Sequence, residues 1–124
     1  MSWFKRKVKP SRPSETFLPQ RIDFVGEQAG PADDDLKKRF CEVFVHTPTV
    51  QSAYLARLSY GDSPGYSVGL CIRSSVGLDE PLEKRLAQVF AEVFRSEEHL
   101  DIMFIRGDQE KALKKVCSPF YESA

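Results

Sequence analysis

The strongest pattern in the sequence is a run of apolar residues at helical spacing between residues 79 and 94. Side chains that recur at three- and four-residue intervals lie along one stripe of a helix, and such a stripe must be buried against other structure. Asp79 can cap the start of this helix, and a proline is tolerated in its first turn. The pattern therefore predicts a long amphipathic helix. Its apolar stripe comprises Leu82, Leu86, Val89, Phe90, Val93 and Phe94.

A further helix is predicted upstream, after a short strand. Residues 21–26 alternate polar and apolar side chains, as a strand does, and the Gly-Pro step at 30–31 then breaks the chain. Three aspartates at positions 33–35 are expected to supply an N-cap and negative charge for the positive end of the helix dipole. We expect this helix to continue to about His46. Its buried stripe is expected to comprise Leu36, Phe40, Val43 and Phe44.

Two long extended runs, residues 50–60 and 66–73, are separated by the turn-forming residues 61–65 and predict a β-hairpin. The first run has apolar residues in both alternations, so the pattern leaves open which of its faces is buried. The second run has one strongly apolar face and one thinner face. These faces carry Tyr66, Val68, Leu70 and Ile72, and Ser67, Gly69, Cys71 and Arg73, respectively.

A last strand is expected at residues 100–106, and a short final helix is expected from Asp108 to just before Pro119. The order of elements is that of a ferredoxin-like βαββαβ fold of the α+β class, with an antiparallel sheet, helices on one face and an additional C-terminal helix. The second face of this sheet then needs a cover, which is either the C-terminal helix or another subunit. The apolar side chains to be covered are Met103 and Ile105, or Ile102 and Phe104.

Length and charge divide the chain into two regions. A chain of 124 residues can bury one core without disulfides or metals, but it cannot bury two. Residues 1–21 carry six basic residues against one acidic residue, whereas the 18 Lys and Arg of the whole chain balance 18 Asp and Glu. The rest of the chain is therefore net acidic. We predict a flexible basic tail at residues 1–19 and a single α+β domain at residues 20–124.

The tail begins with aromatic and basic side chains, as interfacial membrane anchors do. A weak contact with an anionic membrane surface is one interpretation, but a solvated tail is favoured because the apolar stretch is only two residues long. No segment approaches the ~20 apolar residues of a membrane span, and no apolar block follows the basic N-terminus as a secretory signal requires. A cytoplasmic protein is expected. The candidate anchor comprises Trp3, Phe4, Lys5, Arg6 and Lys7.

Residues 50–56, Val-Gln-Ser-Ala-Tyr-Leu-Ala, follow a helix that ends at a proline. This segment resembles the signature of the C-terminal domain of the enhanced serine sensitivity (SseB) protein family. The strand at 23–26, the helix start at Pro31 and the terminal residues 119–121 occur in the order that this family shows, so the resemblance covers roughly residues 20–122. Family members commonly carry an additional N-terminal domain, where this sequence has its basic segment. The resemblance implies a fold and supplies no defined catalytic residues.

Side chains that could support catalysis are few. Cys41, Cys71 and Cys117 lack metal-binding spacing and are expected to be buried reduced thiols. His46 lies at a helix end, where a structural role is favoured, and His99 lies beside acidic residues with no adjacent nucleophile. We therefore predict no catalytic, cofactor or metal site and no enzymatic activity. Specific nucleic-acid binding is set aside as well, because the hairpin lacks a base-stacking motif and the folded region is net acidic.

The remaining hypothesis is a protein-interaction surface. Tyrosine rings near the hairpin are typical of contacts, and a mid-strand glycine permits close approach of the protein's own last helix or of a partner. The sequence predicts a non-enzymatic interaction or regulatory module that forms a homo-oligomer or binds another protein. The alternatives are a small enzyme or ligand-binding protein that uses Cys71 or His99, and a membrane-surface protein anchored by the tail. The predicted interaction surface comprises Tyr54, Tyr60, Gly69, Cys71, Met103 and Ile105.

Overall fold

The structure is a computed structural model that describes residues 22–60, 67–94 and 99–123. Within these residues the chain forms five strands and three helices, which confirms the predicted α+β class. The predicted tail and the predicted hairpin turn lie outside the described residues. In chain order the elements are β1 (Ile22–Glu27), α2 (Pro31–Phe44), β2 (Val50–Tyr60), β3 (Ser67–Ser74), α3 (Glu80–Val93), β4 (Asp101–Phe104), α4 (Gly107–Lys114) and β5 (Tyr121–Glu122).

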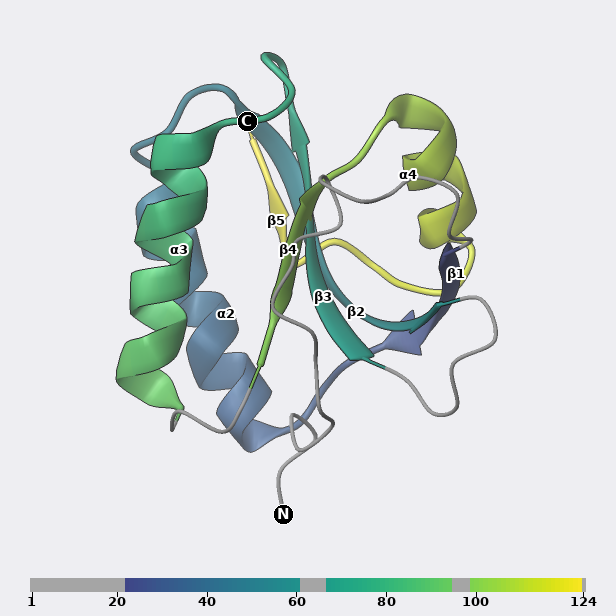
Figure 1. The fold of residues 1–124 in the computed structure, drawn as a ribbon, viewed down its shortest axis with the longest axis horizontal. Helices are drawn as coiled ribbons and strands as arrows, with labels where there is room; N and C mark the ends of the chain where they lie inside the picture. Colours follow the sequence, from purple (N-terminus) through teal and green to yellow (C-terminus); the bar gives the residue numbers. More distant parts are fainter. Residues whose placement is uncertain (1–21, 61–66, 95–98, 124) are drawn as a thin grey trace.

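The strands form one mixed sheet in which the first four follow the order of the chain, β1-β2-β3-β4 (Figure 1). The pairs β1–β2 and β2–β3 are antiparallel, whereas β3 and β4 are parallel. The ferredoxin-like arrangement is not confirmed, because it requires an antiparallel sheet throughout. The parallel pair arises because α3 carries the chain back along the sheet before β4 begins, so β4 runs in the same direction as β3.

Both faces of β2 are buried, which answers the question that the sequence left open. The register with β3 shifts between Val50 and Ser52, and Val50 therefore joins the same core as Ala53 and Leu55. Side chains on the other alternation join a second core. A strand that is apolar on both faces suits an interior position in a sheet, and β2 has β3 on one edge and both β1 and β5 on the other.

Helices α2 and α3 cover one face of the sheet (Figure 1). The α3 N-cap is confirmed, because the Asp79 carboxylate accepts a hydrogen bond of 3.1 Å from the backbone nitrogen of Leu82. The predicted stripe of α2 is buried in full, and the predicted stripe of α3 is buried or packs against the same core. The helical parts of this first core are Leu36, Phe40, Val43, Phe44, Leu82, Leu86 and Phe90, with Val89, Val93 and Phe94 partly buried against them.

The start of α2 differs from the expectation. The helix begins at Pro31 with Gly30 as its N-cap, and no side chain caps it, so the predicted aspartate cap is wrong. Asp33 is instead buried and accepts a hydrogen bond of 3.1 Å from Nε2 of Gln28. Gly30 has a φ of 152°, and a Cβ atom there would lie 3.1 Å from Asp33 Oδ2. Asp33 and Asp34 do place negative charge in the first turn, where it stabilises the helix dipole.

Helix α4 covers the opposite face of the sheet and completes a second core (Figure 1). Leu113 projects from α4 into this core and is fully buried. The sequence left two possible covers for Met103 and Ile105, and the C-terminal helix is the one observed. The second core comprises Tyr54, Ala56, Leu58, Cys71, Met103, Ile105, Leu113 and Cys117.

Gly69 permits a close approach within this second face. A Cβ atom at Gly69 would lie 2.4 Å from Leu58 Cδ1 and 3.6 Å from the carbonyl oxygen of Asp101. Leu58 is fully buried, so its side chain has little room to move aside. The close approach expected at this glycine is therefore to a side chain of the neighbouring strand, and not to the last helix or to a partner.

The short strand β5 is not predicted by the sequence pattern. Its segment lies along the first half of β2, where Phe120 donates a backbone hydrogen bond to Ala53 and Ser123 donates one to Gln51, each of 2.9 Å. The ring of Tyr121 lies 5.2 Å from the ring of Phe44, and its hydroxyl donates to the Phe44 carbonyl at 3.3 Å. Two strand residues are too few to show an alternating pattern, so the sequence does not predict this strand. Backbone hydrogen bonds to β2 and aromatic contacts with α2 hold the segment in place.

Candidate functional site

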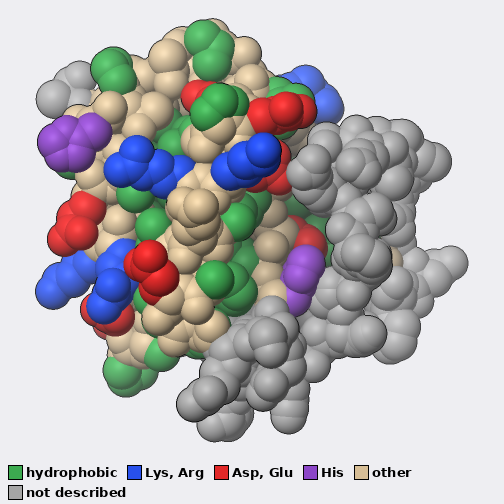
Figure 2. All heavy atoms as spheres, turned by 60° about the vertical axis from the view of Figure 1, so that its left-hand side comes forward, with side chains coloured by type: hydrophobic (Ala, Val, Ile, Leu, Met, Phe, Trp, Pro, Cys, Tyr) green, Lys and Arg blue, Asp and Glu red, His purple; other side chains and the backbone are tan. Residues whose placement is uncertain are grey.

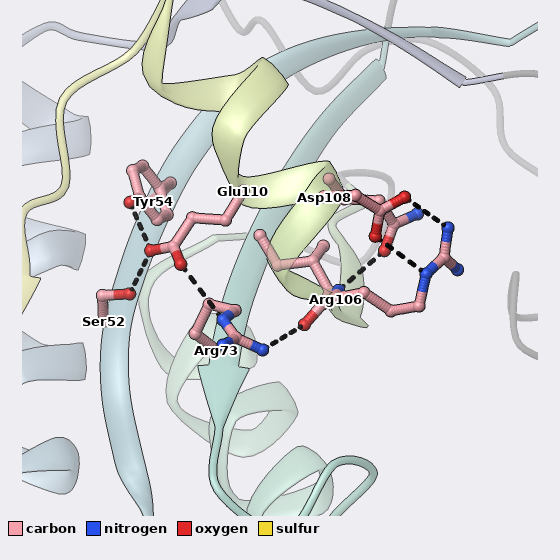
Figure 3. Close-up of polar contacts among 8 residues, drawn as sticks. Ser52, Tyr54, Arg73, Arg106, Asp108 and Glu110 are labelled. Atoms are coloured by element: carbon pink, nitrogen blue, oxygen red, sulfur yellow. Dashed lines mark hydrogen bonds and ion pairs between the residues drawn. The ribbon is translucent and has the colours of Figure 1, made fainter.

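Polar side chains from two strands meet a carboxylate of α4 where this helix lies on the sheet (Figure 3). The hydroxyls of Ser52 and Tyr54 both donate to Oε2 of Glu110, at 2.7 and 2.6 Å. Residues two positions apart on a strand point to the same face, which explains why both hydroxyls of β2 reach one oxygen. Tyr54 is fully buried and Ser52 is nearly so. Glu110 therefore accepts two hydrogen bonds in a place with little access to water.

Arg73 of β3 completes this cluster from the other side. Its Nε atom lies 3.0 Å from Oε1 of Glu110, and its Nη1 atom donates to the carbonyl oxygen of Ile105 at 3.5 Å (Figure 3). The side chain of Glu110 is 17% exposed and that of Arg73 is 29% exposed. One carboxylate thus ties α4 to two neighbouring strands. We call Ser52, Tyr54, Arg73 and Glu110 the Glu110 cluster.

The electrostatics of the Glu110 cluster favour a fixed protonation state. Burial by itself would raise the pKa of Glu110, but hydrogen bonds from Tyr54, Ser52 and Arg73 outweigh it and hold the pKa below its ordinary value. Burial and the neighbouring Glu110 carboxylate raise the pKa of Tyr54. At neutral pH the carboxylate is therefore ionised and the phenol is protonated. This arrangement anchors a helix, and neither group changes its protonation state near neutral pH.

The first turn of α4 is held by a separate pair of side chains. Nε and Nη2 of Arg106 lie 3.0 and 3.1 Å from the two carboxylate oxygens of Asp108, and both side chains are exposed. The backbone nitrogen of Arg106 donates to Oε1 of Gln109 at 2.8 Å. The hydrogen bond from Arg106 lowers the pKa of Asp108. Both carboxylates within α4 are thus bound by arginines.

A second polar group lies at the start of β4. Tyr60 donates to Oδ2 of Asp101 at 2.6 Å, and Nε2 of His99 lies 2.8 Å from Oδ1 of the same carboxylate. Burial, followed by the charge of Asp101, raises the pKa of Tyr60. Asp101 therefore orients both an imidazole and a phenol. A carboxylate that orients an imidazole is a common arrangement for proton transfer as well as for structure.

Comparison with protein-family models matches residues 27–123 to the SseB protein C-terminal domain. The chain belongs to the SseB family. Searches of curated proteins and of solved structures gave no significant match. The matched range of the SseB domain includes α2, α3, α4 and the whole Glu110 cluster.

The segment at residues 50–56, on which the resemblance to the SseB domain was based, has a physical explanation in the structure. Its two hydroxyl residues, Ser52 and Tyr54, bind Glu110. Its buried apolar residues divide between the two cores, with Ala53 in the first and Ala56 in the second. The segment that carried the family resemblance is therefore the strand on which both cores and the α4 anchor are built.

The predicted interaction surface of the SseB domain is not a surface. Five of its residues are buried in the second core or beside it, and Tyr60 is half-buried against that core. The structure does bring the set together, but it places the set beneath α4. Within the described residues this set therefore offers no exposed contact, because α4, one of the two covers that the sequence left open, folds back over it. These residues are Tyr54, Tyr60, Gly69, Cys71, Met103 and Ile105.

The candidate tail anchor, Trp3 to Lys7, lies outside the described residues and stays a prediction. Among the helices that the structure describes, none is long and apolar enough to span a membrane. The described part of the chain also holds no group of three or more His, Cys, Asp or Glu side chains placed to bind a metal ion.

Sequence reasoning missed Glu110, Arg73 and Asp101. The side-chain partners of Glu110 and Arg73 are distant in sequence, and Asp101 joins the distant Tyr60 as well as the nearby His99. No local motif marks these three residues. One signal was available for Glu110, because it lies three positions before the buried Leu113 and therefore on the inward side of α4. A carboxylate on the buried side of a helix requires polar partners.

All three cysteines of the SseB domain are free thiols. Cys71 and Cys117 are buried as expected, whereas Cys41 is only half-buried. Burial raises the pKa of Cys41, and burial together with nearby Cys117 and Asp101 raises that of Cys71. Burial also raises the pKa of Cys117 to about 12. A nucleophilic thiolate at Cys71 is therefore disfavoured.

We expect thiol titration of the native protein to show slow reaction at Cys71 and Cys117 and faster reaction at Cys41. The thiolate is the reactive form, and both burial and a raised pKa suppress it. The measurement is the rate of labelling with an aromatic disulfide at pH 8, with each cysteine identified by mass spectrometry. Denaturant should make the three rates similar. Fast native labelling at Cys71 would contradict this expectation and would restore that residue as a candidate nucleophile.

Proposed function

We propose that this SseB domain is a non-enzymatic protein-interaction module that self-associates through one apolar end. The observation that carries the proposal is the position of three exposed apolar side chains. Val45 is 62% exposed, Val76 is 59% exposed and Leu78 is 54% exposed, and all three lie in loops at the same end of the molecule. Exposed apolar side chains that gather in one place are typical of association sites.

The two loops are joined by a backbone hydrogen bond. The nitrogen of Ser75 donates to the carbonyl oxygen of Thr49 at 2.8 Å, which holds the α2–β2 loop beside the β3–α3 loop. Both loops lie at the upper end of the molecule in Figure 1, and Figure 2 shows hydrophobic side chains exposed at that end. We call residues 45–49 and 75–78 the apolar end.

The chemistry of the apolar end favours a second copy of the chain as its partner. A twofold interface places each patch against the same patch on its partner, so a patch with charges of one sign would repel itself. His46 is the only ionisable residue within 45–49 and 75–78. A patch with a single ionisable side chain can therefore face its own copy with little like-charge repulsion. Three exposed apolar side chains support weak association that depends on protein concentration.

Two features of the interior support the non-enzymatic part of the proposal. The Cys71 thiol lies in the second core, and the Glu110 carboxylate is engaged by three donors that lower its pKa. The free thiols also suit a reducing compartment such as the cytoplasm. A small enzyme or ligand-binding protein that uses His99 is the second candidate, and the contact between His99 and Asp101 is the observation that favours it.

We expect the double variant Val76→Asp/Leu78→Asp to remain a monomer at concentrations where the wild-type protein self-associates. Two carboxylates brought against their own copies lose apolar contact and add repulsion. The measurement is sedimentation equilibrium over a wide range of concentrations. A matched control is Val25→Asp/Val116→Asp, which alters two exposed valines elsewhere, at 52% and 40% exposure, and should associate as the wild type does.

Two outcomes would count against the proposal. A wild-type protein that sediments as a monomer even at high concentration has no such interface. Equal loss of association in the control variant would show that added negative charge, and not the apolar end, decides the result.

A further inference from the structure

We infer that the outer face of α4 binds an acidic segment of another protein through Lys111, Lys114 and Lys115. All three side chains are exposed. Lys114 and Lys115, the C-cap, lie three and four positions after Lys111, so they project from the same side at the end of the helix. This face lies on the opposite side of the sheet from α2 and α3 (Figure 1). The inference goes beyond self-association at the apolar end, because it concerns a different surface and a different partner.

The positive charge of this face is only partly balanced within α4. The charge of Lys114 helps to lower the pKa of Glu110, but both carboxylates of the helix are hydrogen-bonded to other side chains. Asp108 is bound by both nitrogens of the Arg106 fork, and Glu110 turns inward to Arg73 and the two hydroxyls. Among the described residues none forms an ion pair with the three lysines. The last turn of a helix is stabilised by cations, but that effect does not require three lysines on one side.

The remaining helical surface differs from this face. Figure 2 shows basic and acidic side chains interspersed over α2 and α3, and the ion pair between Arg39 and Asp35 is one example there. A mixed surface has little net attraction for a charged partner, whereas three ammonium groups on one side of a short helix attract carboxylates. The three lysines are therefore the distinct charge feature of the described helices.

The form of the face favours an acidic polypeptide over an anionic membrane or a nucleic acid. Its exposed apolar side chains are limited to Ala112 and Val116, so it lacks the large residues that insert into a membrane. Its three lysines span about one helical turn, whereas nucleic acids are usually bound by extended basic surfaces. A short segment rich in Asp or Glu matches both its length and its charge. Attachment by the Glu110 cluster keeps the helix, and with it the lysines, in place.

The test measures binding of a fluorescently labelled oligoglutamate peptide to the full chain by anisotropy at low salt. Lys111→Glu/Lys115→Glu is the test variant, and it leaves Lys114 in place because this residue contributes to the low pKa of Glu110. We expect about tenfold weaker peptide binding, since two favourable ion pairs are lost and two repulsions are added. Lys111→Arg/Lys115→Arg should bind as the wild type does, which separates loss of charge from loss of fold.

The matched control is Lys84→Glu/Arg85→Glu on α3, which changes the net charge by the same amount at two exposed positions. It should weaken peptide binding by less than about twofold. The basic N-terminal segment is present in every variant and contributes equally. Equal loss in both variants would reduce the effect to net charge and overturn the inference. Absence of wild-type binding would also overturn it, as would tighter binding of anionic vesicles or of RNA through the same lysines.

Discussion

Replacing Glu110 by alanine is expected to lower the free energy of unfolding by about 3 kcal/mol, because charge-assisted hydrogen bonds are lost and buried donors are left unpaired. The hydroxyl of Tyr54 is fully buried, and it has Glu110 as its acceptor at 2.6 Å. The measurement is urea unfolding followed by circular dichroism. Lys111→Ala is the matched control on the same helix, and it should change stability by less than about 0.5 kcal/mol because this side chain is exposed.

The pH dependence of this effect has a definite sign. The pKa of Glu110 lies below its ordinary value of 4.5 in the folded protein. A carboxylate with a lowered folded pKa contributes stability that is fully present above its unfolded pKa and is lost as the pH falls through the folded pKa. The difference in stability between the wild type and Glu110→Gln should therefore be constant near neutral pH and shrink below about pH 4.5. A constant difference down to strongly acidic pH would contradict the assigned role of the charge.

Removing the Tyr54 hydroxyl should offset part of the stability loss in the Glu110→Ala variant, where this hydroxyl has lost its acceptor. Tyr54→Phe alone deletes one hydrogen bond, whereas in the Glu110→Ala background it deletes a hydroxyl that has already lost its acceptor. The double variant should therefore lose about 1 kcal/mol less free energy of unfolding than the sum of the losses in the two single variants. Additive losses would mean that Tyr54 and Glu110 stabilise the fold independently.

The sequence predicts the helices and most of the strands because their patterns are local. The stripes of α2 and α3 are confirmed, and so is the Asp79 cap, since periodicity and capping depend on residues within one or two turns. Strand order is a different matter. The pairing of β4 with β3 depends on where α3 delivers the chain, and no alternation within residues 101–104 encodes that direction.

Only part of the candidate site could be predicted from the sequence, because its contacts join residues that are far apart along the chain. Ser52 and Tyr54 stand out as two hydroxyls on one strand face, but their acceptor lies on α4, far along the chain. The six residues predicted as a surface do lie on one face of the sheet, as expected. That face is covered by α4 of the same chain. Apolar and aromatic residues at an interface and in a core have the same composition, so composition alone cannot separate the two.

Leu113→Ala is expected to cost about 3 to 4 kcal/mol, because truncating a fully buried leucine loses its transfer free energy and leaves a cavity. Leu113 is 0% exposed and lies in the second core with Cys71 and Cys117. The variant should also loosen α4 selectively, so Cys71 and Cys117 should label faster while Cys41, which lies on α2, should not. Leu78→Ala, at a leucine that is 54% exposed, is the matched control and should change neither stability nor labelling.

The labelling pattern distinguishes two ways in which the second core could fail. If α4 and the sheet form separate cooperative units, the two thiols beneath α4 become reactive in Leu113→Ala while the core under α2 and α3 keeps its protection. If the whole domain unfolds as one unit, the labelling rates of all three thiols increase together. We expect the first result, because α4 is joined to the sheet mainly through Leu113, Cys117 and the Glu110 cluster. Uniform acceleration would show instead that the anchor stabilises the entire domain.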